Sequence, residues 1–155
     1  MSGAIDRFLE VARGLGHDVE VRRFPQGTKT AEDAARAIGC EVGQIVKSLV
    51  FIAGGRPVLA LTSGANRVDT ARLAALAGTV EARRASPEEA RAATGFAVGG
   101  TPPFTTVPIP TFIDETLLGF ETVWAAAGTP DAVFAIAPDE LVRSSGGTVT
   151  AFAQA

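Results

Sequence analysis

An apolar run, a turn sequence and a second apolar run constrain the fold of this chain more than any other feature. Residues 44–53 read Gln-Ile-Val-Lys-Ser-Leu-Val-Phe-Ile-Ala, and residues 58–62 read Val-Leu-Ala-Leu-Thr. The intervening Gly54-Gly55-Arg56-Pro57 is typical of a tight turn. Apolar segments joined in this way predict an antiparallel hairpin, so we expect the core to be built on a sheet.

Lys47 is the only charged residue of the first run, and Lys29 and Lys47 are the only lysines among the 14 basic residues. Because side chains alternate along a strand, Lys47 shares a face with Ile45, Leu49 and Phe51. An ammonium group there must be paired, have its pKa lowered, or open into a pocket where a ligand is its partner. A lysine on an edge strand can instead extend its ammonium group into water. Spacing alone leaves the pocket and the edge surface as alternatives.

Further helices and strands are predicted along the whole chain from periodicity and from capping or turn residues. Helices are expected over residues 4–13, from a cap at Thr30 to Gly39, from residues 66–69 through Leu76, from Ser86 to Gly95 and from Pro138 to Gly146, with a helical turn at 114–118. Strands are expected around residues 19–23, 79–81, 111–113, 122–126, 133–136 and 149–152. Because hairpins join several strands, we predict one α+β domain, residues 1–155, with a mixed, largely antiparallel, curled and barrel-like sheet surrounded by helices.

Composition narrows the class of protein. A single cysteine, Cys40, allows no internal disulfide and fits a reducing cytoplasm. The sequence has neither an apolar stretch long enough to span a membrane nor a secretory signal at its start, so a cytoplasmic protein is expected. A net charge of -3 argues against binding along a long nucleic-acid duplex, but it leaves open the recognition of one end of an RNA. The basic clusters Arg22-Arg23, Arg67 with Arg72, and Arg83-Arg84 are interpreted singly as solvated surface.

Familiar catalytic motifs are absent from the sequence. One histidine and one cysteine provide neither a two-histidine metal motif nor a cysteine pair for zinc, and we expect no metal and no cofactor. A Ser/His/Asp or Cys/His arrangement would need His17, for which a surface position is the commoner interpretation. There is no GxxxxGK motif, and Gly14-Leu15-Gly16 follows a helix where a dinucleotide site needs a strand.

A loop rich in glycine and proline is the second candidate feature. Residues 99–104 read Gly-Gly-Thr-Pro-Pro-Phe. Glycine permits a close backbone approach, and two prolines stiffen the turn. Such a loop would present bare amides of Gly100 and Thr101 to an oxyanion or a terminal ribose, although a purely structural turn is the commoner interpretation.

Five segments, in this order and spacing, resemble the YbaK/EbsC family, free-standing relatives of the editing insertion domain of bacterial prolyl-tRNA synthetase. They are residues 30–35 (Thr-Ala-Glu-Asp-Ala-Ala), 44–51 (Gln-Ile-Val-Lys-Ser-Leu-Val-Phe), 99–104 (Gly-Gly-Thr-Pro-Pro-Phe), 112–115 (Phe-Ile-Asp-Glu) and 127–130 (Ala-Gly-Thr-Pro). The lysine strand and the GxxxP loop, Gly99 to Pro103, are the specific parts of the resemblance.

The resemblance implies a metal-independent aminoacyl-tRNA hydrolase that acts in trans on a wrongly charged tRNA. The substrate would most often be proline tRNA carrying a small amino acid such as Ala, Cys, Ser or Thr. Water attacks the ester with help from the ribose hydroxyl of the substrate. The partners implied are the tRNA acceptor end and prolyl-tRNA synthetase. The resemblance implies catalytic roles for Lys47, Gly100 and Thr101, and substrate binding by Phe24, Thr30, Ser48, Gly99, Pro102, Pro103, Asp114, Gly128 and Thr129.

The chain departs from the family at Thr105-Thr106, where many relatives carry Gly-His. This difference motivates an alternative function, a non-catalytic module that binds an aminoacyl end or nucleotide in the same pocket. Schiff-base chemistry at a desolvated Lys47 is a third hypothesis. The sequence does not determine the amino acid removed, the tRNA used or the oligomeric state.

Overall fold

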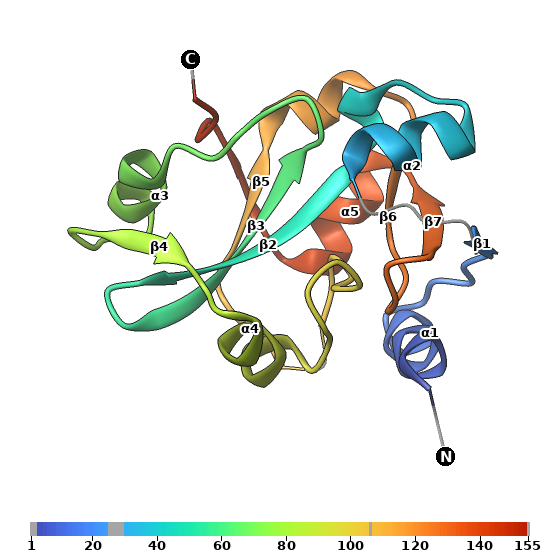
Figure 1. Cartoon of the computed structure of the whole chain (residues 1–155), viewed down its shortest axis with the longest axis horizontal. Helices are drawn as coiled ribbons and strands as arrows, with labels where there is room; N and C mark the ends of the chain where they lie inside the picture. The colour runs from blue at the N-terminus through green and yellow to red at the C-terminus, as the bar shows by residue number, and fades with distance from the viewer. Residues whose placement is uncertain (1–2, 25–29, 106, 155) are drawn as a thin grey trace.

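The structure is a computed structural model that describes residues 3–24, 30–105 and 107–154. The described part of the chain contains five α-helices and two short 3-10 helices (Figure 1). They are α1 (Ala4–Gly14), α2 (Ala31–Ile38), η1 (Val42–Gln44), α3 (Thr70–Leu76), α4 (Pro87–Thr94), η2 (Glu115–Gly119) and α5 (Pro138–Ser145). Each predicted helix is confirmed within a few residues, and η1 was not predicted.

The predicted hairpin is confirmed as β2 (Val46–Ala53) and β3 (Arg56–Ser63), which pair antiparallel along their whole length. They form the centre of a five-stranded sheet in the order β4-β2-β3-β5-β8. The other members are β4 (Ala82–Arg84), β5 (Thr111–Asp114) and β8 (Thr148–Thr150). The pairs β3-β5 and β5-β8 are parallel, so the sheet is mixed as expected.

A second sheet of three antiparallel strands lies beside the first (Figure 1). Its order is β1-β7-β6, formed by β1 (Val21–Arg23), β7 (Ala132–Ile136) and β6 (Val123–Ala126). Among the described residues, one isolated bridge, between Ile45 and Trp124, joins the two sheets. We expected one curled, barrel-like sheet, but the described strands form two sheets, because β6 and β7 complete a hairpin of their own.

The strand predicted at residues 79–81 was wrong, and the strand in this region is β4, which begins at Ala82. Thr79 remains attached to the end of α3, where its N–H donates to the carbonyl oxygen of Ala74 at 2.8 Å. Gly78, with φ of 75°, makes this reversal of the chain possible. The hydrogen bond that ends α3 therefore keeps Thr79 out of the strand, although threonine has a high β propensity.

Capping residues fix where two helices begin, as predicted. The Thr30 side chain accepts a hydrogen bond from the amide of Asp33 at the start of α2. Ser86 and Glu89 form a reciprocal capping box at the start of α4. The pKa of Glu89 is lowered to about 2, because Arg83 and the Ser86 amide both donate to its carboxylate.

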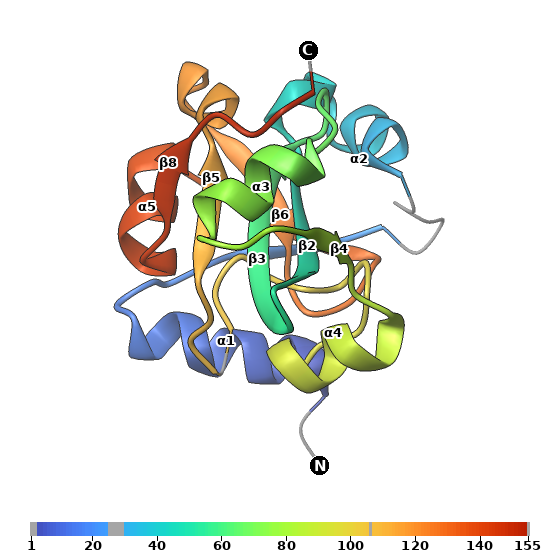
Figure 2. The same cartoon turned by 90° about the vertical axis from the view of Figure 1, so that its left-hand side faces the viewer.

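Hydrophobic clusters cover both faces of the β2–β3 hairpin. The larger cluster contains Val46 and Val50 of β2 and the buried side chain of Phe8 from α1. Phe8 contacts the rings of Phe104 and Phe134, with centroids 5.6 and 4.7 Å apart. On the other face, a smaller cluster includes Phe51 of β2 with side chains from α3 and the C-terminal segment, and Figure 2 shows α3 lying across this face. The hairpin is thus packed on both faces, β5 pairs with the edge of β3, and β4 pairs with only part of the edge of β2.

None of the helices in the described ranges is long and apolar enough to cross a membrane.

Candidate active site

One edge of β2 is only partly covered. Along this edge β4 pairs with Phe51–Ala53 alone, and the Ile45–Trp124 bridge lies at the opposite end. Residues 46–49 between these points have no strand partner on this side within the described ranges. The two sheets therefore diverge here and leave a gap beside the strand that carries Lys47.

A cavity of about 750 Å³ fills this gap. Its wall is formed by β2, the start of α2, the segment after β3, the residues before and within the glycine and proline loop, and strands β6 and β7. Sites for small molecules in proteins typically have about 300 to 1,000 Å³. The predicted site residues Thr30, Lys47, Ser48, Gly99 and Thr101 all line this cavity.

Lys47 extends from β2 into the cavity and is partly buried. Its Nζ donates a hydrogen bond to the backbone carbonyl oxygen of Asn66 at 2.6 Å. Desolvation lowers the pKa of Lys47, Glu32 opposes this effect, and the positive charges of Arg67 and Arg84 add to it. The ammonium group has no carboxylate partner within the described ranges, so two of its three donors remain for a ligand.

Asp114 lies behind this lysine and does not line the cavity. Its carboxylate is buried and accepts hydrogen bonds from the Ser63 amide at 3.1 Å and the Asn66 side chain at 2.9 Å, besides capping η2. These contacts hold Asn66 so that its backbone carbonyl oxygen faces Lys47. The structure thus gives Asp114 a contact to a neighbour of Lys47, whereas the resemblance implied a contact to substrate.

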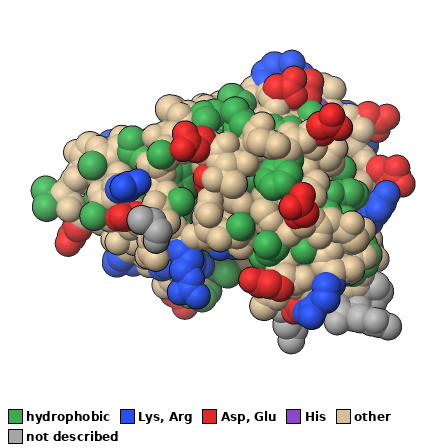
Figure 3. Space-filling model, turned by 90° about the horizontal axis from the view of Figure 1, so that it is seen from above, with side chains coloured by type: hydrophobic (Ala, Val, Ile, Leu, Met, Phe, Trp, Pro, Cys, Tyr) green, Lys and Arg blue, Asp and Glu red, His purple; other side chains and the backbone are tan. Residues whose placement is uncertain are grey.

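Charged side chains around the cavity are mostly positive, although the chain has a net charge of -3. Lys47, Arg67 and Arg84 line it, against one carboxylate, that of Glu32. Elsewhere, as on the face seen in Figure 3, acidic and basic side chains are scattered among the others. A concave site with this imbalance attracts anionic ligands.

Each of the three basic clusters contains one arginine in an ion pair and one arginine without a carboxylate partner in the described ranges. Arg23, Arg72 and Arg83 form ion pairs with Asp131, Asp69 and Glu89. Their neighbours Arg22, Arg67 and Arg84 have no carboxylate partner within the described ranges. Arg67 and Arg84 line the cavity, and Arg22 stacks on Trp124, which also lines it. We interpreted these clusters as ordinary surface. The Arg72–Asp69 pair has the i, i+3 spacing of a helix, which the sequence shows, whereas the partners of Arg23 and Arg83 lie farther along the chain.

Only part of the glycine and proline loop lines the cavity. Gly99 and Thr101 line it, whereas Gly100, Pro102 and Pro103 are buried and do not. The Gly100 amide donates to the carbonyl oxygen of Ala97 at 3.0 Å, so the expectation of a bare amide at Gly100 was wrong. The Thr101 amide has no partner among the described residues.

Gly100 is required by packing against a second loop. A Cβ atom at Gly100 would lie 2.6 Å from the carbonyl oxygen of Gly128 and 2.7 Å from the Cα atom of Thr129. The Gly128 amide donates to the carbonyl oxygen of Gly100 at 3.0 Å. Gly128 and Thr129 therefore support the loop from behind, and their neighbour Pro130 reaches the cavity.

Three other predicted residues have distinct positions. Phe24 follows β1, donates its amide to the carbonyl oxygen of Asp131 at 2.7 Å and does not line the cavity. Thr30 lines the cavity while its side chain caps α2. The hydroxyl oxygen of Ser48 is buried and has no hydrogen-bond partner in the described structure, although other atoms of Ser48 line the cavity. Thr105 does not line the cavity, and Thr106 lies outside the described residues.

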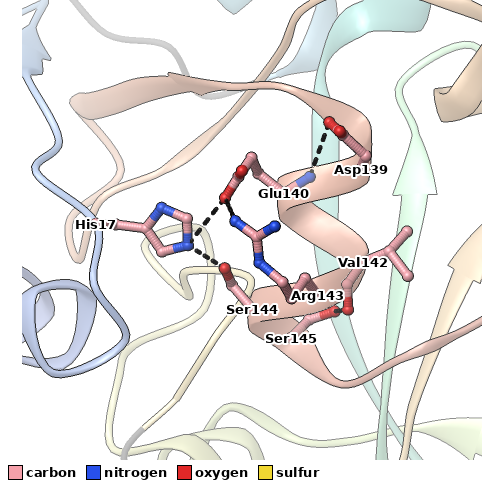
Figure 4. Close-up of polar contacts among 7 residues, drawn as sticks. All are labelled: His17, Asp139, Glu140, Val142, Arg143, Ser144 and Ser145. Carbon is pink, nitrogen blue, oxygen red and sulfur yellow. Dashed lines mark hydrogen bonds and ion pairs between the residues drawn. The ribbon is translucent and has the colours of Figure 1, made fainter.

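His17 lies away from this cavity, in a separate polar cluster between α1 and α5 (Figure 4). Its Nε2 atom shares a hydrogen bond with Ser144 Oγ and lies 3.6 Å from Glu140 Oε2, while its ring stacks on Phe104. A catalytic triad requires the carboxylate at the other ring nitrogen. Because serine and carboxylate approach the same nitrogen, this cluster is not a triad.

No group of three or more histidine, cysteine, aspartate or glutamate side chains suited to holding a metal ion occurs within the described ranges.

A family model matches most of the chain. The model for the aminoacyl-tRNA editing domain covers residues 25–144. The chain belongs to this family. The predicted resemblance to the YbaK/EbsC group is thereby confirmed at the level of the family.

Relatives include both free-standing proteins and synthetases. The EbsC protein of Enterococcus faecalis, named as a candidate deacylase of Cys-tRNA(Pro) and Cys-tRNA(Cys), is 27% identical over 120 residues, 76% of this chain and 73% of EbsC. The proline-tRNA ligase of Maridesulfovibrio salexigens is 35% identical over 100 residues, 64% of this chain but 17% of the ligase. The editing domain thus corresponds to a small part of that enzyme.

A solved structure shares the whole architecture. A candidate trans-editing enzyme for prolyl-tRNA synthetase is 43% identical, with a TM-score of 0.93 over 100% of this chain and 99% of that chain. The two-sheet arrangement is therefore the fold of the editing domain.

Proposed function

We propose that this chain, acting as one domain over residues 1–155, is a trans-acting deacylase that hydrolyses the ester of a mischarged tRNA. The observation that carries the proposal is Lys47, an ammonium group without a carboxylate partner in a cationic cavity, on the strand that matches the family. The preferred substrate is proline tRNA carrying Ala, Cys, Ser or Thr. The name of EbsC and the description of the solved relative support proline tRNA.

The terminal adenosine and its aminoacyl group enter the cavity beside the open edge of β2. Lys47 donates to an oxygen atom of the substrate, and the cations Arg67 and Arg84 attract the phosphodiester chain that follows. Ser48 forms part of the wall beside Lys47, and its hydroxyl oxygen is buried. Small apolar side chains, Ala85, Ala90 and Val98, leave a wall suited to a small amino acid.

Hydrolysis proceeds by attack of a water molecule on the ester carbonyl carbon. The neighbouring ribose hydroxyl group relays a proton: it accepts one from the water while its own moves toward the ester oxygen of the ribose. Negative charge develops on the carbonyl oxygen. The Thr101 amide and the Lys47 ammonium are the donors available to that oxyanion. The ester C–O bond then breaks, and the departing ribose oxygen takes up the proton. Aminoacyl esters are activated, so positioning and oxyanion stabilisation supply the catalysis without a protein base or a metal ion.

The alternative is a module that binds an aminoacyl end without cleaving it, motivated by Thr105-Thr106 where relatives carry Gly-His. Loss of labelled amino acid from Ala-, Ser-, Thr- and Cys-charged proline tRNA decides between the two. We expect hydrolysis of at least one substrate by the wild type, and the accepted amino acids will report the size of the pocket. Binding of all four without turnover would favour the module instead.

A further inference from the structure

The outer face of the three-stranded sheet continues the cavity in one direction. Residues paired directly across strands share a face, so Trp124 lies with Ala135, and Ala126 lies with Val133. Arg22 of β1 pairs with Val133 and lies on the same face. Trp124, Ala126 and Val133 all line the main cavity. The floor of the site therefore extends from Lys47 across β6 and β7 toward β1.

Arg22 and Trp124 form a stacked pair on this face. The guanidinium carbon of Arg22 lies 4.9 Å from the centroid of the indole ring. Arg22 is exposed, whereas Trp124 also packs against the small cluster around Ile45. Ala135, opposite Trp124, has no side chain beyond Cβ, which leaves space for Arg22 to reach across β7. A planar guanidinium on an indole offers a flat cationic surface to a further ring.

Trp124 is also the wall between the main cavity and a second cavity of about 290 Å³. The second cavity is lined by Arg22, Ala135 and the carboxylates of Asp18 and Glu20, besides that of Glu140, which is ion-paired with Arg143. The carboxylates of Asp18 and Glu20, which have no ion pair within the described ranges, disfavour a phosphate group here. They suit a neutral ring with an amino group at its edge, because carboxylates accept from the exocyclic amine of cytosine.

We propose that the Arg22–Trp124 pair and the adjoining cavity bind the unpaired cytosine that precedes the terminal adenosine of the tRNA. This inference rests on the proposed function, because every tRNA ends in the single-stranded sequence CCA. With the terminal residue beside Lys47, its neighbour lies across Trp124, and the base stacks on the guanidinium of Arg22. Aromatic and arginine surfaces are the usual platforms for unpaired bases.

The test uses an acceptor-stem minihelix whose 3′ alanine is attached through an amide and is not hydrolysed. Trp124, the only tryptophan of the chain, reports binding by its fluorescence. For the wild type, an abasic residue in place of the cytosine should weaken binding about tenfold. Arg22→Ala should weaken binding of the intact RNA by a similar factor and should make the protein indifferent to the abasic change. With hydrolysable substrate, Arg22→Ala should raise KM and leave kcat unchanged.

Two further variants sharpen the result. Arg23→Ala, on the same strand but ion-paired with Asp131, should bind like the wild type. Arg22→Lys keeps the positive charge but lacks the planar guanidinium group, so it should bind the RNA about as weakly as Arg22→Ala. Full rescue of binding by Arg22→Lys would indicate a phosphate contact and overturn the proposal. The proposal would also be overturned if Arg22→Ala and the abasic residue each weakened binding by their own factor and the two factors multiplied when combined. Wild type that hydrolyses substrate with no dependence on this cytosine would overturn this inference alone, whereas wild type that neither binds nor hydrolyses the RNA would overturn the proposed function too.

Discussion

Two polar regions of this molecule contrast in how far their charges are satisfied. In the cluster between α1 and α5, His17 is bonded to Ser144, and Glu140 lies between His17 and Arg143 (Figure 4). In the cavity beside β2, Lys47 has a backbone carbonyl as its partner, and Arg67 has no carboxylate partner within the described ranges. The first region holds a histidine, a serine and a carboxylate, which are the residue types of a hydrolase triad, whereas no histidine lines the second among the described residues.

The difference teaches that residue type is a poor guide to the site and that unsatisfied hydrogen-bonding capacity is a better one. Groups that satisfy one another stabilise a fold but have little left for a ligand. A partly buried ammonium group without a carboxylate partner, as at Lys47, carries a free-energy cost that a ligand removes. The predictions below test this contrast.

The largest effect is expected for Lys47→Ala. Loss of the ammonium group should lower kcat/KM for deacylation by about 100- to 1,000-fold, the usual cost of removing one donor to an oxyanion. His17→Ala, in the other cluster, should keep its activity, and circular dichroism should show both variants folded. A reversed outcome, with His17 essential and Lys47 dispensable, would place the chemistry between α1 and α5.

Asp114→Ala should affect both stability and activity. Its buried carboxylate accepts from Ser63 and Asn66, and leaving these donors unpaired should cost about 3 kcal/mol in the free energy of unfolding. Because Asn66 then loses its position beside Lys47, kcat should fall about tenfold under conditions where the variant remains folded. Urea denaturation and single-turnover deacylation measure the two effects. Unchanged kcat in a folded Asp114→Ala protein would show that Asn66 does not position Lys47.

Arg67→Ala and Arg72→Ala form a matched pair within one basic cluster. Arg67 lines the cavity without a carboxylate partner in the described ranges, whereas Arg72 is ion-paired with Asp69. We expect Arg67→Ala to raise KM about fivefold and to reduce the dependence of KM on salt, because one phosphate contact is lost. Arg72→Ala should change neither. Equal effects of the two substitutions would mean that only the general charge of this surface matters.

His17→Ala should lower stability without changing the chemistry. Loss of its hydrogen bond to Ser144 and its contact with Phe104 should reduce the free energy of unfolding by about 1 kcal/mol. Thermal unfolding and steady-state deacylation measure this in parallel. His17→Gln, which retains a side-chain donor, should recover part of the loss. A fall in kcat without a fall in stability would contradict a structural role.

The smallest effect concerns the pKa of Lys47, which desolvation lowers below its ordinary value. The folded state then binds fewer protons than the unfolded state between the two pKa values, so stability rises with pH across that window. At neutral pH the charged Lys47 lowers stability, and Lys47→Met should raise the free energy of unfolding by less than about 1 kcal/mol. Lysine titration by NMR after isotopic methylation is simple, since Lys29 is the only other lysine. A pKa for Lys47 equal to or above that of Lys29 would contradict the desolvation argument.

Local sequence signals predicted the elements of the fold well. The turn at Gly54-Gly55 produced the β2–β3 hairpin, and Thr30 and Ser86 began their helices as expected. These features depend on hydrogen bonds within a few residues, which sequence patterns report directly. The split into two sheets was not predicted, because it depends on β6 and β7 pairing with each other and meeting β2 at the single Ile45–Trp124 bridge.

For the site, the sequence by itself determined Lys47 and the Gly99 to Pro103 loop as candidates. A charge in an apolar strand and a run of glycine and proline are visible without coordinates. Only the tertiary structure decided that Asp114 contacts Asn66 and that Arg67 and Arg84 face the cavity. The Gly100 amide is used in a local turn with Ala97, which the sequence pattern did not reveal. The physical reason is that a group functions through what remains unsatisfied after folding, and partners such as Asp131 for Arg23 or Asp114 for Asn66 are assigned only when distant segments pack together.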